Sequence, residues 1–128
     1  MAIFPTLLLV DDEPLIRALL ASALDDSGYN VVETRNGDDA MEVIDSSEHL
    51  SGIITDISLG SRVNGWEVGR YARGRFPNVA VVYMTGDSGA EWTAESVANS
   101  IVLLKPFSLT QMVAAVSRVL SAADHTTG

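Results

Sequence analysis

The chain contains no cysteine, which excludes disulfide bonds, cysteine-based metal sites and a cysteine nucleophile. It is also poor in basic residues, with 8 Lys and Arg against 17 Asp and Glu and a net charge of −9. An acidic chain of this kind is poorly suited to the phosphate backbone of nucleic acids. We therefore expect no direct nucleic-acid partner.

Long hydrophobic runs are absent as well. No apolar run approaches the about 20 residues that a membrane-spanning helix needs. The N-terminus "MAIFPTLLLVDD" lacks the basic region of a signal peptide and reaches acidic residues early. We expect a cytoplasmic protein with no membrane partner, and the lack of cysteine fits a reducing compartment.

The length and the apolar content indicate one folded domain. The chain has 128 residues, of which 47% are hydrophobic. This is enough for a single hydrophobic core without disulfide bonds or structural metals. No linker, repeat or low-complexity segment interrupts it. We expect one domain over residues 1–128, with a core over about 5–122 and a frayed tail at 123–128.

Short apolar runs alternate with segments of helical period. The runs predict strands at about 6–10, 30–34, 52–56, 79–84 and 100–104. The segments between and after them predict helices at about 13–24, 37–45, 65–73, 88–97 and 109–122, the fourth being the poorest in apolar residues. Five βα units favour an α/β fold with an open, doubly wound parallel sheet.

Polar residues follow four of the five predicted strands. Asp11 and Asp12 follow the first, Asp56 ends the third, Thr85 follows the fourth and Lys105 follows the fifth. The carboxyl ends of parallel strands meet at one edge of the sheet, where functional groups collect. We therefore expect these side chains to lie together.

The stretch "LLLVDDEP" ends an apolar run in three consecutive acids, and carboxylates held close together need a cation. Acids before a helix can also act as helix caps, and we expect Glu13 to be a cap first. Oxygen ligands suit Mg²⁺, and a carboxylate beside Mg²⁺ can attack phosphorus to form an acyl phosphate. A lysine and a hydroxyl nearby complete a site for phosphoryl transfer.

The sequence resembles the response-regulator receiver domain of two-component signalling, the type found in the chemotaxis regulator. The resemblance runs from about Pro5 to Leu120 and is carried by "LLLVDDEP", "IITDISLG", "VVYMTG" and "LLKPF", in this order. It implies a flavodoxin-like (βα)5 fold with strand order 2-1-3-4-5.

The resemblance also implies a role for each acid. Asp56 would accept a phosphoryl group from a phosphohistidine. Asp12 and Asp56 would bind Mg²⁺ directly, together with the backbone carbonyl of Ser58, while Asp11 would act mainly through water.

The remaining family residues lie near the ends of the fourth and fifth strands. Lys105 would contact the phosphoryl group, Thr85 would move to meet it, and the backbone N–H of Gly86 would assist. The bond from Lys105 to Pro106 would be cis. Val102 stands where many members carry an aromatic switch residue, so a switch based on rotation of an aromatic ring is not expected there.

The expected donor is a sensor histidine kinase or a histidine phosphotransfer protein. Since no output domain follows the fifth predicted helix, the output is expected in a partner protein or in a longer chain. The protein would not be an enzyme beyond its own phosphorylation and dephosphorylation. Two alternatives remain: a receiver-like interaction module that takes no phosphate, and a Mg²⁺-dependent phosphatase working through an aspartyl phosphate.

Overall fold

The computed structural model describes residues 4–86 and 92–126. Five parallel strands form one sheet in the order β2-β1-β3-β4-β5, which confirms the predicted fold class and strand order. The strands are β1 (Thr6–Val10), β2 (Asn30–Thr34), β3 (Gly52–Asp56), β4 (Ala80–Thr85) and β5 (Ser100–Leu104).

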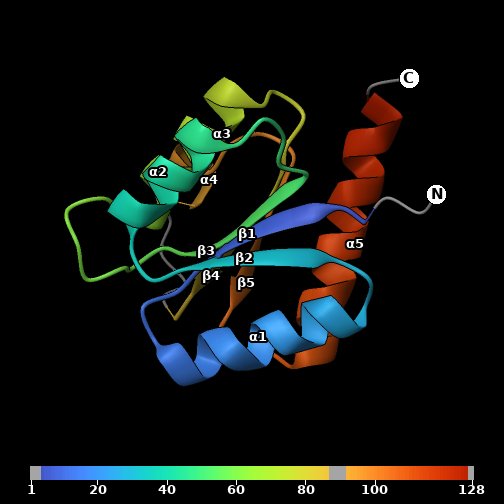
Figure 1. Cartoon of the computed structure of the whole chain (residues 1–128), viewed down its shortest axis with the longest axis horizontal. Helices are drawn as coiled ribbons and strands as arrows, with labels where there is room; N and C mark the ends of the chain where they lie inside the picture. Colours follow the sequence, from blue (N-terminus) through green and yellow to red (C-terminus); the bar gives the residue numbers. More distant parts are fainter. Residues whose placement is uncertain (1–3, 87–91, 127–128) are drawn as a thin grey trace.

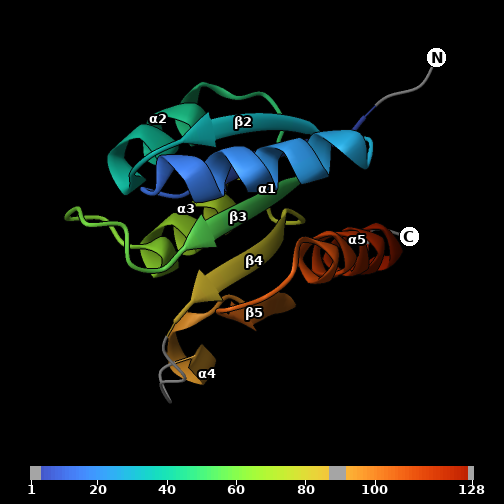
Figure 2. The ribbon, with the colours of Figure 1, turned by 90° about the horizontal axis from the view of Figure 1, so that it is seen from below.

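Helices cover both faces of the sheet. They are α1 (Pro14–Asp26), α2 (Gly37–Ser46), α3 (Gly65–Arg75), α4 (Trp92–Glu95) and α5 (Leu109–Thr126). In Figure 1, α1 and α5 lie on one face, and α2, α3 and α4 lie on the other. Figure 2 views the molecule from the side of α1 and α5.

Alternate strand residues divide the core between the two faces. Leu7 and Leu9 of β1 belong to the cluster beneath α1 and α5, whereas Leu8 and Val10 belong to the cluster beneath α2 and α3. All four side chains are fully buried. Strands covered on both faces explain the nearly continuous apolar runs in the sequence.

All five helices differ somewhat from their predicted ranges, and the fourth and fifth are the most informative. Residues 88–91 of the fourth predicted helix lie outside the described part, and α4 ends at Glu95, before the expected end at Val97. The Val97 N–H donates to the buried Tyr83 hydroxyl at 3.2 Å, a bond made outside the helix. Conversely, α5 continues to Thr126, beyond the expected end at Ala122.

Among the described residues, no helix has both the length and the apolar character needed to cross a membrane.

Candidate functional site

The sheet register brings the predicted site residues to one edge. Val10 of β1 pairs with Thr55 of β3, so the residues that follow them emerge side by side. Asp56 in turn pairs with Met84, immediately before Thr85. The strand ends therefore converge as expected for a parallel sheet.

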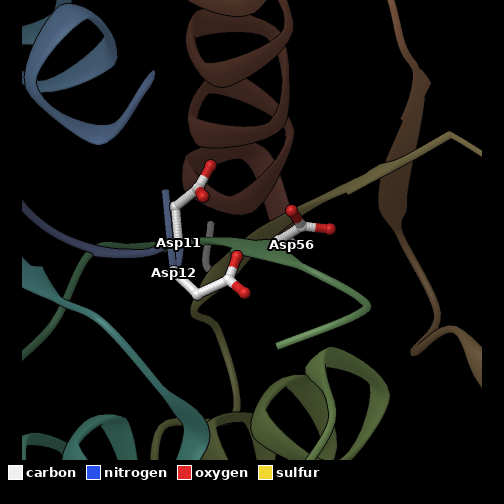
Figure 3. Close-up of side chains that lie close together, drawn as sticks. All are labelled: Asp11, Asp12 and Asp56. Carbon is white, nitrogen blue, oxygen red and sulfur yellow. The ribbon is translucent and has the colours of Figure 1, made fainter. Parts of the chain in front are cut away.

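Three carboxylates gather at this edge. Figure 3 shows Asp11 and Asp12 at the end of β1 and Asp56 at the end of β3. One oxygen from each lies within 4.8 Å of the others. Asp11 is fully buried, Asp56 is 5% exposed, and Asp12 is exposed. Like charges at this spacing repel, so the cluster favours a bound cation.

Lys105 supplies a fixed positive charge from the end of β5. Its Nζ donates to Oδ2 of Asp56 at 2.7 Å, and the two side chains are 30% and 7% exposed. Burial lowers the pKa of Lys105, but the hydrogen bond and the charges of Asp56, Asp11 and Glu13 outweigh it, so the pKa is raised. The lysine is therefore held in its charged form beside the carboxylate.

The other predicted groups surround the same space. One pocket at the sheet edge is lined by Asp12, Glu13, Asp56, Ile57, Ser58, Thr85, Gly86 and Lys105. Ser58 is exposed, whereas Thr85 is 7% exposed. The Lys105–Pro106 peptide bond is cis, as the resemblance implies. The predicted residues thus line one pocket, except Asp11, which lies buried beside it.

Asp11 provides the clearest test of whether a metal fits. Its Oδ1 accepts the Glu13 N–H at 2.9 Å, but Oδ2 is buried with no hydrogen-bond partner among the residues that the structure describes. Burial is the main cause that raises the pKa of Asp11, and the charge of Asp56 adds to it. A buried oxygen without a partner is costly. A hydrated divalent cation among the three acids would supply the missing partner, so the residues fit Mg²⁺.

The cost of burying the Asp11 carboxylate predicts the effect of an Asp11→Asn substitution. The amide keeps an acceptor for Glu13, removes a buried charge and offers a donor toward Asp56. In EDTA we expect the free energy of unfolding to rise by about 1–2 kcal/mol. When Mg²⁺ is present, the variant's advantage in free energy of unfolding should shrink, because Mg²⁺ binding stabilises the wild-type protein. Urea unfolding under both conditions measures this, and a less stable variant in EDTA would contradict it.

The prediction that Glu13 caps the first helix is right about the position but wrong about the side chain. Glu13 occupies the N-cap position of α1, but its side chain makes no capping hydrogen bond to any described residue. The bond runs instead from its N–H to Asp11, because the short aspartate side chain can reach a backbone N–H two residues ahead. The acid run therefore serves both the helix start and the acidic cluster.

The sequence analysis missed two residues that hold this site in place. Gly65, at the start of α3, packs so closely that a Cβ there would lie 2.2 Å from the backbone oxygen of Asp56. Arg17 of α1 donates through Nη1 to the backbone oxygen of Asp11 at 2.7 Å. The sequence offered one signal for Arg17, because it is the only basic residue before Arg35 and follows the acid run closely.

Val102 lies opposite Tyr83 in the β4–β5 register. It is half-buried and packs against the α2–α3 cluster, to which Tyr83 also belongs. Two aromatic rings lie in this cluster: Tyr83 of β4 is fully buried, and its ring centroid lies 4.6 Å from that of Trp66 of α3. That Val102 cannot act as an aromatic switch stays a prediction.

Comparison with known proteins gives a consistent result. Residues 7–117 match the sequence profile of the response regulator receiver domain. The crystal structure of a response regulator receiver protein from Sinorhizobium medicae WSM419 superposes with a TM-score of 0.90 at 38% identity, covering 94% of this chain and 97% of that one.

Two further proteins extend the comparison. The nitrogen assimilation regulatory protein NtrX of Azorhizobium caulinodans is 32% identical over 117 residues, 89% of this chain but 26% of NtrX. The chain thus spans about a quarter of that relative's length. The receiver domain of the sensor histidine kinase PA1611 from Pseudomonas aeruginosa, crystallised with a magnesium ion in its active-site cleft, has a TM-score of 0.79 at 20% identity, covering 93% of this chain and 99% of that one.

Proposed function

Because the chain belongs to the response regulator receiver domain family, we propose that it accepts a phosphoryl group on Asp56 from a phosphohistidine donor. The observation that carries this proposal is the placement of Asp56. Its carboxylate lies in an acidic cluster that suits a divalent cation, bonded to a lysine at 2.7 Å and lining a pocket open to an incoming group.

The metal would be held by Asp12, Asp56 and the backbone carbonyl of Ser58, with Asp11 acting mainly through water. Bound Mg²⁺ would offset negative charge on the transferring phosphoryl group. The magnesium ion in the PA1611 receiver cleft supports this assignment. Among the described residues, these acids are the group placed to hold a metal.

The transfer uses the Asp56 carboxylate as the nucleophile. A carboxylate oxygen forms a bond to phosphorus while the N–P bond of phosphohistidine breaks, which leaves imidazole and an acyl phosphate. Lys105 would pair with an oxygen of the new phosphoryl group, which its contact with the Asp56 carboxylate supports. The Thr85 hydroxyl and the Gly86 N–H, which line the same pocket, would donate to the other oxygens.

Movement of Thr85 toward the phosphoryl group would shift a two-state equilibrium at the face formed by α4 and β5. The expected partners are a sensor histidine kinase or a histidine phosphotransfer protein upstream, and an output protein or domain downstream. The chemistry is limited to the protein's own aspartate, so we do not expect turnover of external phosphate esters.

The test uses phosphoramidate, whose N–P bond resembles that of phosphohistidine. With Mg²⁺ we expect a mass gain of one phosphoryl group by intact-protein mass spectrometry, stable in acid and lost in base. With EDTA the gain should be absent. No gain under either condition would favour an interaction module that takes no phosphate, and multiple turnover of a phosphate ester would favour a phosphatase.

A further inference from the structure

Arg17 connects the first helix to the strand end that carries the acid pair. Its Nη1 donates to the backbone oxygen of Asp11 at 2.7 Å. Its Nε lies 3.4 Å from Oε1 of Glu33, a residue of β2. The Arg17 side chain is 20% exposed, against 45% for Glu33. The guanidinium group is thus largely enclosed and held from two sides.

The contacts around Asp11 leave it little freedom. Its N–H donates to the backbone oxygen of Thr34 at 3.1 Å, its carbonyl accepts from Arg17, and its Oδ1 accepts from Glu13. The remaining polar atom is Oδ2, which is buried and has no hydrogen-bond partner within residues 4–86 and 92–126. Protein contacts therefore fix each polar atom of Asp11 except one carboxylate oxygen.

The carbonyl that Arg17 binds belongs to the peptide joining Asp11 to Asp12. A peptide unit is planar, so fixing this oxygen also fixes the backbone N–H and the Cα of Asp12. Asp12 is exposed, and α1 begins two residues later, at Pro14. The Arg17 bond thus restrains the backbone from which the more exposed of the two neighbouring acids projects.

We propose that Arg17 is a positioning residue of the metal site, holding the Asp11–Asp12 peptide so that both carboxylates face the same cation as Asp56. This inference rests on the proposed function, because it presumes that the acidic cluster binds Mg²⁺. Arg17 itself contacts neither metal nor phosphoryl group. It acts through the backbone of the acid pair.

The direction in which removal of Arg17 changes the Mg²⁺ affinity distinguishes a positioning role from a purely electrostatic one. A positive charge near a cation site weakens Mg²⁺ binding through Coulomb repulsion. If charge alone mattered, removing Arg17 would tighten binding. If Arg17 positions the acids, its removal weakens binding, as loss of groups that orient metal ligands does.

The experiment measures the Mg²⁺ dissociation constant by calorimetry and by amide chemical shifts for the wild-type protein and three variants. We expect Arg17→Met to weaken binding about tenfold, the lower end for groups that orient metal ligands. Arg17→Lys keeps the charge and one donor, and should recover part of the affinity. Arg118→Met removes an exposed arginine of α5 and should bind like the wild type.

Unfolding in EDTA is measured in parallel, so that lost stability is not mistaken for lost affinity. A folded Arg17→Met variant that binds Mg²⁺ as tightly as the wild type, or more tightly, overturns the proposal. If Arg17→Met does not fold, the Arg17→Lys and Glu33→Gln variants test the proposal instead. Mg²⁺ affinity equal to that of the wild type in both variants overturns the proposal. A wild-type protein that fails to bind Mg²⁺ instead contradicts the proposed function.

Discussion

Replacing Asp56 with asparagine is expected to abolish phosphoryl uptake from phosphoramidate. The amide oxygen of asparagine is a far weaker nucleophile than a carboxylate, and no acyl phosphate can form on it. The variant should still fold, because asparagine has the same shape and its Oδ1 can accept the hydrogen bond that Lys105 now donates to Asp56. Intact mass spectrometry with Mg²⁺ present measures the outcome.

The control for this variant is Asp26→Asn. Asp26 is an exposed acid at the far end of α1 from the acidic cluster, so the substitution changes the same chemical group away from the site. It should take up one phosphoryl group like the wild type. Uptake by Asp56→Asn at the wild-type level would show that another residue is the acceptor.

Replacing Gly65 with alanine is expected to cost about 3 kcal/mol of folding stability, because a buried site without space tolerates added atoms poorly. The new Cβ would lie 2.2 Å from the Asp56 backbone oxygen and 2.7 Å from the Ile57 Cα. Backbone atoms cannot rotate away as the end of a side chain can. Either α3 or the segment that carries Asp56 must move. Urea unfolding gives the loss, and weaker Mg²⁺ binding should accompany it.

Gly74, near the end of the same helix, is the matched control. A Cβ there would meet no atom of the described residues within 4 Å. Because alanine favours a helix over glycine by up to about 1 kcal/mol, Gly74→Ala should leave stability unchanged or raise it slightly. If Gly65→Ala behaved in the same way, the close approach of α3 to Asp56 would not constrain this site.

Much of the site was predictable because its chemistry lies at strand ends. The apolar runs mark the strands, parallel strands end at one edge, and the residues after them are read directly from the sequence. Asp11, Asp56 and Lys105 were placed together on this basis, and the structure confirms that they meet. The structure also confirms the predicted fold class and the strand order that the resemblance implied.

Helix boundaries were predicted less well where tertiary contacts decide them. The N–H of Val97 bonds to Tyr83, a residue of β4, and α4 ends at Glu95. Periodicity along the chain carries no information about a hydroxyl group that arrives from another strand. The bond from the Glu13 N–H to Asp11 is local by contrast, and it was missed because the cap was assigned to the Glu13 side chain.

Residue type and strand period are local properties, so they are enough to predict which chemical groups reach the edge of the sheet. How those groups are held depends on the packing of helices and strands that lie far apart in the chain. Arg17 binds the backbone between the acids, and Gly65 lets α3 approach Asp56. One oxygen of Asp11 is buried without a hydrogen-bond partner in the described part of the chain. Each of these depends on distances between atoms of separate elements, and such distances are set when the elements pack.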